Sequence, residues 1–394
     1  MSINSIENAV RYSEELDAMF SQKSVTGFFA DNNLAAKFVG AKTVMIPDVD
    51  FQGLADYDRD TGFSRGAITV SNTPYTMSMD RARSLQIDRE DMDETGIASL
   101  AGKILGEYVK SKVVPECDAY VLSKLAGLAN SRGNVITGGA QTPFETLCEL
   151  TTEVRNQVGY DEELVAFVHS NIYALFQTSP EISRMLNVTE FKRGDVNTTV
   201  YSVNGVTLIP VVPERMKSAY TFNNNAAGGF IPAENAREIY MVVCPKKGVH
   251  LVKKTEHLRV FTPEQNLDAD AYKFDYRIYY DVFVKKSGLD AVWTCVSPEI
   301  KFVEHPSYLG ISLSEPTGQP LTAEAKVSSG EITYQWYICD DINGTGARKI
   351  VGATGRTYAL PMPMEIGSTY YFVRATVDGT AFADSRCAEV EVTE

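Results

Sequence analysis

The residue types that most often carry chemistry in proteins are sparse in this chain and widely spaced. The four histidines are His169, His250, His257 and His305, and no two of them have the spacing of metal ligands on one element. There is no H-E-x-x-H zinc motif. His169 ends a predicted buried strand, where we expect it to cap a turn rather than to act as a base. The sequence therefore predicts no catalytic residue, no metal site and no enzyme activity.

Cysteines and glycine-rich segments also lack the patterns of cofactor sites. The six cysteines are scattered and contain no C-x-x-C pair: Cys117, Cys148, Cys244, Cys295, Cys339 and Cys387. Cys339 and Cys387 share the last domain, where free thiols are the expected state in a reducing cell. The segment 223–230 (NNNAAGGF) matches neither a dinucleotide-binding nor a Walker motif, so we predict a surface loop and no cofactor.

One acidic stretch resembles a calcium loop, because aspartates occur there at alternate positions. The glycine that such a loop requires is displaced to Gly62, and its twelfth position holds Ala67 instead of a bidentate glutamate. We therefore interpret the stretch as a charged tip that is either solvated or paired with Arg59 or Arg65 of a neighbouring subunit. The candidate intersubunit contacts are Asp56, Asp58, Arg59, Asp60 and Arg65.

Composition narrows the class of protein. The chain has 394 residues, 44% of them hydrophobic, and a formal charge of −14, which is unlike a dedicated nucleic-acid binder with its basic stripe. No N-terminal signal pattern and no apolar stretch of bilayer length are present. We expect a soluble protein, made in the cytoplasm, that has no membrane partner.

The element that must organise the chain is an amphipathic helix near residues 93–130. Apolar residues recur there at the i, i+4 spacing of a helix, and 95–114 alone spans about 30 Å. Gly102 and Gly106 weaken this spine, and Pro115 must kink it or start a new segment. These three residues are our candidates for spine flexibility; close packing of a neighbour against the glycines is the alternative.

Two segments before this helix cannot bury their apolar residues alone. Residues 1–42 form a predicted arm with a short amphipathic helix, and 43–90 form a predicted long β-hairpin with a wide polar tip. An isolated two-stranded ribbon is only marginally stable in water. We therefore expect another chain to cover both segments.

The remainder divides into a mixed domain and an all-β domain. Strands and helices alternate over 134–250, with Asn204-Gly205 as the strongest turn signal, and long strands over 251–302 are expected to pack on the spine. Beyond 303, about seven short strands surround Trp336 and Tyr370, the predicted core residues of an immunoglobulin-like sandwich.

The order of these elements resembles the major capsid protein of tailed bacteriophages, which has the Hong Kong 97-like fold. The segments that carry the resemblance are DYDRDTGFSRG in the hairpin, LQIDREDMDETG before the helix and VVPECDAYVLSKLA through its proline. The resemblance implies an α+β fold with these parts: N-terminal arm 1–42, extended loop 43–90, peripheral-domain spine 91–133, axial domain 134–250, peripheral strands 251–302 and immunoglobulin-like domain 303–394.

By this resemblance, the chain self-assembles into hexamers and pentamers of an icosahedral head shell. Its implied partners are a separate scaffolding protein, a portal and packaged double-stranded DNA held by non-specific contacts, for which Arg11 and Lys23 are candidates. No lysine occurs between Lys42 and Lys103, so we do not expect covalent cross-linking of the loop through lysine. The implied location is the virion, after assembly in the host cytoplasm.

Two other functions remain open at this point. An encapsulin-like compartment would use the same fold to hold protein cargo. An immunoglobulin-domain adhesin would use the terminal sandwich at a cell surface, although a signal peptide is missing from the sequence. Within the shell hypothesis, the terminal domain is expected on the outer surface, where it contacts host envelope or glycans or decorates the shell.

Overall fold

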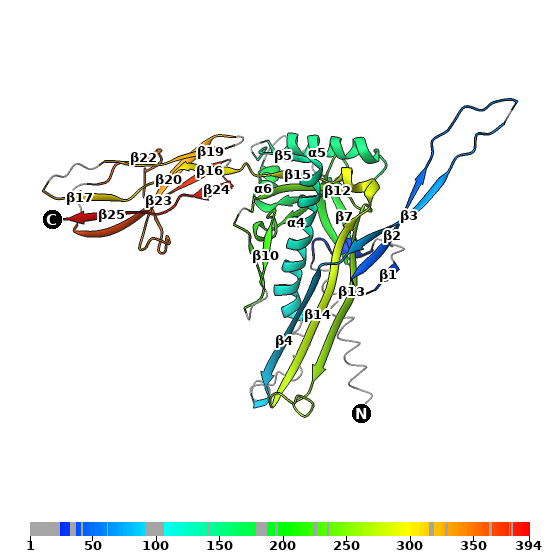
Figure 1. Cartoon of the computed structure of the whole chain (residues 1–394), viewed down its shortest axis with the longest axis horizontal. Helices are drawn as coiled ribbons and strands as arrows, with labels where there is room; N and C mark the ends of the chain where they lie inside the picture. The colour runs from blue at the N-terminus through cyan, green and yellow to red at the C-terminus, as the bar shows by residue number, and fades with distance from the viewer. Residues whose placement is uncertain are drawn as a thin grey trace.

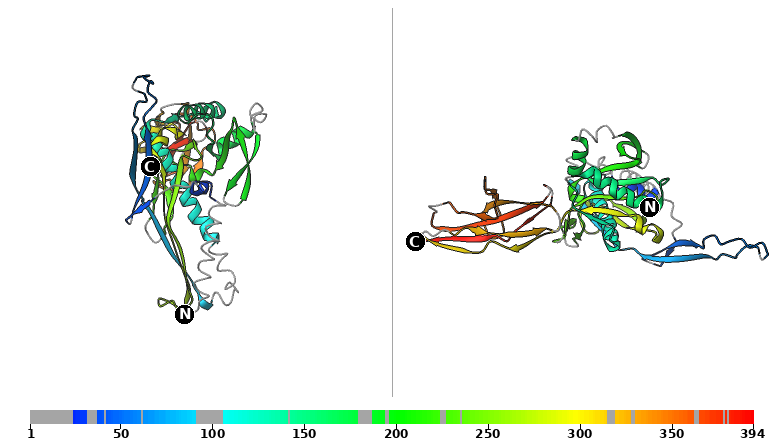
Figure 2. Two further views of the ribbon diagram at one scale, coloured as in Figure 1. Left: turned by 90° about the vertical axis from the view of Figure 1, so that its right-hand side faces the viewer. Right: turned by 90° about the horizontal axis from the view of Figure 1, so that it is seen from above.

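The molecule is elongated, with a central body, a ribbon that projects from one side and a β-domain at the opposite end (Figure 1; Figure 2). The structure, a computed structural model, describes residues 24–31, 37–40, 42–60, 62–90, 106–140, 142–178, 187–193, 196–223, 227–234, 236–314, 319–327, 330–361, 365–377, 379 and 381–394. Gly102, Arg11 and Lys23 lie outside these residues, as does most of the predicted arm.

A seven-stranded mixed sheet forms the upper part of the body. Its strand order is β5 (Val135–Thr137), β15 (Trp293–Val296), β12 (Ile239–Pro245), β6 (Leu164–His169), β9 (Val206–Val211), β8 (Val196–Val203) and β7 (Asn187–Arg193). The predicted turn at Asn204-Gly205 is confirmed, since both residues have positive φ and join β8 to β9. Strand β15 comes from the range predicted to supply peripheral strands, and it pairs here with β12 and β5.

Helices cover both faces of this sheet. Helices α5 (Pro143–Val158) and α6 (Ser170–Thr178) pack on one face through Leu164, Ala166 and Val168 of β6. The alternate residues Val165 and Phe167 face the core that contains α4 (Val114–Arg132). Because successive strand residues point to opposite faces, β6, which is buried over its whole length, serves both layers.

The spine is one continuous helical rod that changes type near its proline. A π-helical turn, η3 (Val109–Val113), precedes α4, and the N–H of Val114 donates to the carbonyl of Val109. Pro115 follows in the first turn of α4, where its missing N–H is tolerated. The predicted break at Pro115 is thus a switch from π to α geometry. At the other end Gly133 takes a left-handed conformation (φ 77°) and caps the helix.

Three long strands lie along the spine and complete the lower body (Figure 1). Strand β14 (Ala271–Val284) pairs with β13 (Val249–Phe261) on one side and with β4 (Met79–Asp88) on the other. Phe274, Tyr276 and Ile278 of β14 are buried in the same core as α4. The prediction that these strands pack against the spine is confirmed.

The ribbon is shorter than predicted. Strands β2 (Thr43–Phe51) and β3 (Ile68–Thr76) pair along their whole length, and β1 (Lys37–Val39) adds to the base of β2. The predicted single return strand is in fact two strands, because β4 leaves the ribbon after Ser78 and joins β14 in the body. The hairpin therefore covers 43–76 and not 43–90.

The C-terminal domain is all-β and has its own core. Its main sheet has the order β17 (Leu309–Ser312), β25 (Ala388–Thr393), β23 (Gly367–Val377), β20 (Ile332–Cys339) and β21 (Arg348–Lys349), and β24 (Ala381–Asp384) also pairs with β23. Two short pairs accompany it: β16 (Ile300–Glu304) with β19 (Glu324–Val327), and β18 (Leu321–Thr322) with β22 (Thr357–Tyr358).

The body also contains a small hairpin, which is formed by β10 (Tyr220–Phe222) and β11 (Phe230–Pro232).

Candidate functional site

The distal half of the ribbon carries an apolar surface that nothing in the described part of the chain covers. Val49 lies opposite Val70, and Phe51 lies opposite Ile68. These four side chains share one face and are 45–68% exposed. Exposed apolar clusters of this kind mark interaction surfaces.

The base of the ribbon is held by its other face. Val44 and Ile46 are 0% and 1% exposed and pack against Tyr279 and Phe283 of β14. Because strand residues alternate between faces, these side chains point away from the face that carries Phe51. The apolar side of the ribbon therefore changes face along its length. The apolar residues of the base pack on the body of the same subunit, and those of the distal half lie on the opposite face and are exposed.

A buried carboxylate fixes the point at which the ribbon leaves the body. Asp281 is fully buried and accepts hydrogen bonds from the Ser78 N–H at 2.9 Å and the Tyr120 hydroxyl at 2.8 Å. Lys124 of α4 pairs with the same carboxylate. The junction between β3 and β4 is thus tied to both the spine and β14, which gives the ribbon a rigid base.

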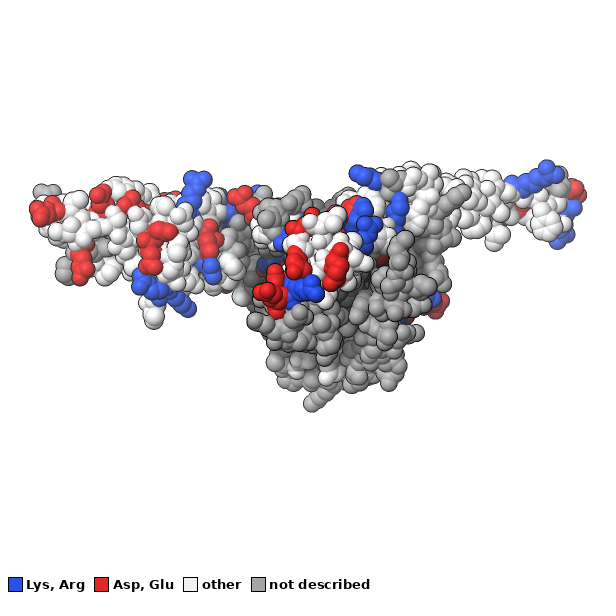
Figure 3. Space-filling model, turned by 90° about the horizontal axis from the view of Figure 1, so that it is seen from below, with Lys and Arg blue, Asp and Glu red and all other residues white. Residues whose placement is uncertain are grey.

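The ribbon tip has a defined local structure. Asp58 accepts hydrogen bonds from the N–H groups of Asp60 at 2.7 Å and Gly62 at 2.8 Å, through its side chain and its backbone carbonyl respectively. Arg59 and Arg65 form no ion pair within the described residues. Side chains of both charge signs gather at this end of the molecule (Figure 3). Pairing of Asp56, Asp58, Arg59, Asp60 and Arg65 with a neighbouring subunit stays a prediction.

One motif match contradicts the expectation that the sequence contains no catalytic motif. Residues 62–66 read G-F-S-R-G and therefore match the nucleophile-elbow pattern G-x-S-x-G. In that motif the serine sits on a sharp turn between a strand and a helix. Ser64 instead lies in the exposed ribbon tip between the strands β2 and β3, so the match lacks the strand-to-helix turn on which the motif depends.

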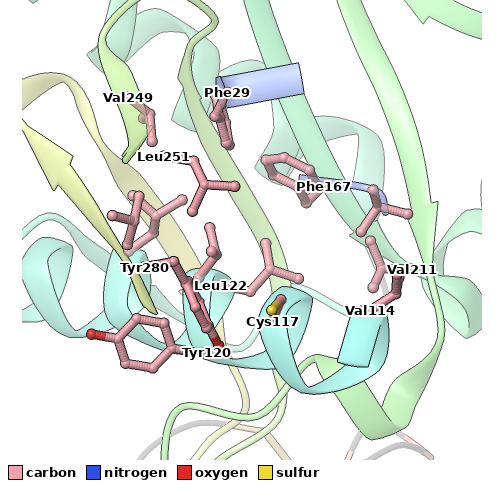
Figure 4. Close-up of a cluster of buried hydrophobic side chains, with 14 of the residues drawn as sticks. Phe29, Val114, Cys117, Tyr120, Leu122, Phe167, Val211, Val249, Leu251 and Tyr280 are labelled. Atoms are coloured by element: carbon pink, nitrogen blue, oxygen red, sulfur yellow. The ribbon is translucent and has the colours of Figure 1, made fainter. Parts of the chain in front are cut away.

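The described part of the arm folds back on its own subunit, which corrects the expectation that all of 1–42 lies on another chain. Phe28 and Phe29 are 4% and 0% exposed and belong to the core of the body. Figure 4 shows Phe29 and Phe167 in the same cluster as Leu122 of α4. The sequence shows that this short segment is apolar, but it does not show which part of the chain the segment packs against.

A second buried carboxylate secures this segment. Asp118 of α4 is fully buried and accepts hydrogen bonds from the hydroxyls of Ser24 at 2.6 Å and Thr26 at 2.7 Å. It also accepts the N–H groups of Val25 and Thr26, and it pairs with Arg215 at 3.0 Å. Sequence reasoning missed Asp118, because a single aspartate in a helix carries no motif.

His169 acts as the prediction describes. Its Nδ1 accepts the N–H of Asn171 at 3.2 Å, which caps the start of α6. Burial, reinforced by the positive charge of Lys217, lowers the pKa of His169 to about 4, so the ring is neutral at pH 7. Within the described residues no cluster of three or more His, Cys, Asp or Glu could hold a metal ion. No helix among them is long and apolar enough to cross a membrane.

In the C-terminal domain the predicted core is right in one residue and wrong in the other. Trp336 is 0% exposed, and its Nε1 donates to the carbonyl of Gly355 at 2.9 Å. Tyr370 points to the opposite face, near Glu389, and Tyr371 occupies the core in its place. The alternation of side chains along β23 allows only one of two adjacent tyrosines to face inward.

Two cysteines of this domain lie side by side as free thiols. The Sγ atoms of Cys339 and Cys387 are 3.8 Å apart. Burial raises the pKa of Cys339 to about 12, which keeps it protonated at neutral pH.

Comparison with known proteins gives distant structural likenesses. No protein-family model and no curated protein match the chain. Among solved structures it is similar to the asymmetric unit of the mature capsid of bacteriophage PhiM1, with 14% identity and a TM-score of 0.43 over 65% of this chain and 82% of that one. It is also similar to the capsid of cyanophage P-SCSP1u, with 13% identity and a TM-score of 0.43 over 66% and 85% of the two chains. The capsid of Myoviridae phage XM1 gives 10% identity and a TM-score of 0.42 over 70% and 92%. The α+β chain is thus similar, at low identity, to bacteriophage capsid structures.

Proposed function

We propose that this chain is the major capsid protein of a tailed bacteriophage and assembles into an icosahedral shell that encloses double-stranded DNA. The single observation that carries the proposal is the ribbon, whose distal apolar face has no partner in the described part of its own subunit. In a monomer, Phe51, Ile68, Val49 and Val70 would all remain in water. In a shell, each ribbon buries this face on an adjacent copy.

The anchoring of the ribbon supports the same function. The bonds of Asp281 hold the base of the ribbon against the body, so the distal part is presented in a fixed direction. A preorganised contact arm loses little conformational freedom on association. A mobile loop would lose more, and a monomeric protein would have no use for a rigid apolar arm.

The sequence resemblance supplies the finer parts of the proposal. The seven-stranded sheet with its helices would form the axial domain, and the spine with β4, β13 and β14 would form the peripheral domain. The C-terminal domain would be an immunoglobulin-like module on the outer surface that decorates the shell or contacts host glycans. A separate scaffolding protein, a portal and packaged DNA would be the other partners, and the chain would have no enzyme activity of its own.

Electron microscopy of the purified protein, produced with and without its scaffolding partner, tests this function. We expect closed shells of uniform size, and nucleic acid inside virions that contain the chain. Monomers that persist in the presence of the scaffolding partner would refute shell assembly. Shells loaded with protein cargo instead of DNA would indicate the encapsulin-like alternative, and recovery of the chain at a cell surface would indicate the adhesin.

A further inference from the structure

The C-terminal domain is connected to the body without a shared core. It projects from one end of the body (Figure 1; Figure 2). Its buried residues surround Trp336 and belong to none of the clusters of the body. Among the described residues, no hydrogen bond, ion pair or strand pairing joins the chain before Pro298 to the chain from Ile300 onward. Because domains without a large apolar interface move relative to each other, the connecting residues decide how this domain is held.

The body end of the connection is anchored at Ser297. Its N–H donates to the carbonyl of Glu238 at 2.8 Å, and its hydroxyl accepts the N–H of Glu238 at 3.0 Å. The Arg237 guanidinium donates to the carbonyl of Ser297 through Nε at 2.8 Å and also through Nη2. Ser297 is 3% exposed. The chain therefore leaves the body from a fixed point.

The other end of the connection is anchored in the C-terminal domain. Ile300 is the first residue of β16 and packs against the core of that domain. Pro298 and Glu299 are the residues that remain between Ser297 and Ile300. The ring of Pro298 fixes its φ at about −65°. The rotations left at the joint are therefore those about ψ of Pro298 and about both dihedrals of Glu299.

An ion pair lies at this joint but does not lock it. Glu299 pairs with Lys301 at 2.9 Å, and the two side chains are 55% and 71% exposed. Exposed ion pairs contribute little to stability. The pKa of Glu299 is lowered first by its hydrogen bond with Lys301 and least by the charge of Arg237. Because Lys301 belongs to the C-terminal domain, the stronger of these interactions does not reach the body.

We propose that Pro298 and Glu299 form a hinge about which the C-terminal domain swings as a unit, and that Arg237 is the positioning residue that fixes the pivot on the body. The hinge is a property of the single chain, whereas its use rests on the proposed function. On a shell, domains that swing would let adjacent copies reach ligand groups that are irregularly spaced. Simultaneous binding by several copies raises the overall affinity without any new contact.

Distances between spin labels, measured by pulsed electron paramagnetic resonance in the frozen, unassembled full-length chain, test the hinge. The interdomain pair is Glu162→Cys in the body and Lys349→Cys in the C-terminal domain, both at exposed positions. The background carries Cys148→Ser and Cys387→Ser, because the other cysteines are buried. The reference pair, Glu162→Cys with Lys112→Cys, lies within the body. We expect the interdomain distance distribution to be at least about twofold broader than the reference.

Variants at the joint locate the pivot. Glu299→Pro fixes a second φ, so the interdomain distribution should narrow towards the width of the reference. Arg237→Gln releases Ser297, so the interdomain distribution should broaden while the reference pair stays narrow and reports an intact body. The matched control is Glu331→Pro, at an exposed position before β20, which should leave the width unchanged.

Each outcome bears on one part of the inference. A wild-type interdomain distribution no broader than the reference would overturn the hinge, and so would a width that Glu299→Pro leaves unchanged. An unchanged width in Arg237→Gln would overturn the positioning role of Arg237. These distances are measured without shells, so absence of shells from the wild-type protein would overturn the proposed function and leave the hinge standing.

Discussion

Replacement of Phe51 and Ile68 by serine should abolish shell assembly and leave the folded subunit intact. The two residues lie directly opposite each other on the ribbon and are 68% and 67% exposed in the subunit. Full burial of one such side chain is worth about 1.5–3 kcal/mol, and about two-thirds of that area is still exposed in the subunit, so each ribbon contact should lose about 2–4 kcal/mol. Because about 1.4 kcal/mol corresponds to a factor of ten, the association constant should fall by about 30-fold to 10³-fold.

The stability of the subunit should hardly change, because exposed positions away from special features usually alter it by less than about 0.5 kcal/mol. Assembly is measured by electron microscopy and light scattering over a range of concentrations, and stability by urea unfolding. The matched control replaces Ile342 and Val351 of the C-terminal domain, which are 54% and 93% exposed, by serine. Wild-type shell yield from the ribbon variant would refute the reasoning, as would equal losses in the control.

Three further predictions concern the body of the subunit. Lys124→Met should lower the free energy of unfolding in urea by about 3–5 kcal/mol, because it leaves the buried charge of Asp281 without its cation; an unchanged midpoint would show that the hydroxyl donors suffice. His169 has a folded-state pKa of about 4, below the unfolded value of 6.5, so folding excludes its proton and stability should fall as the pH drops from 6.5 towards 4, by up to about 3 kcal/mol. His169→Gln should flatten this part of the pH profile, and a titration of the ring by nuclear magnetic resonance with a midpoint near 6.5 would contradict the burial argument. Replacement of both Gly102 and Gly106 by alanine should stiffen the spine and hinder expansion of assembled shells more than their initial assembly, and normal expansion in electron micrographs would remove the proposed role of the two glycines.

The two buried carboxylates illustrate a kind of residue that sequence reasoning does not find. Asp118 and Asp281 each bind groups from distant parts of the chain, and neither belongs to a recognisable motif. Burial of a charge is unfavourable unless it is paired and hydrogen-bonded, so each of these carboxylates requires hydrogen-bond donors and a cation close to it in the folded chain. Together they determine where the N-terminal segment and the ribbon attach to the spine.

Local chemistry was sufficient for the elements whose cause lies within a few residues. The turn at Asn204-Gly205 and an interruption of the spine near Pro115 follow from backbone preferences of those residues, although the π-helical form of the interruption was not predicted. The long strands and the burial of Trp336 follow from apolar patterning. The sequence alone therefore determined the order and type of most elements, and the presence of a ribbon with unsatisfied apolar residues.

Only the tertiary structure decided which surfaces meet. The alternating pattern from Ile68 to Ile87 reads as one strand, but pairing with β14 divides it at Ser78. Tyr370 and Tyr371 are equivalent in the sequence, and the register of β23 selects Tyr371 for the core. A groove beside the spine is lined both by β4 and by the β10–β11 hairpin, which lies more than a hundred residues later in the chain. Strand pairing and the choice of core residues depend on long-range packing. The local sequence pattern indicates only which residues are apolar enough to take part.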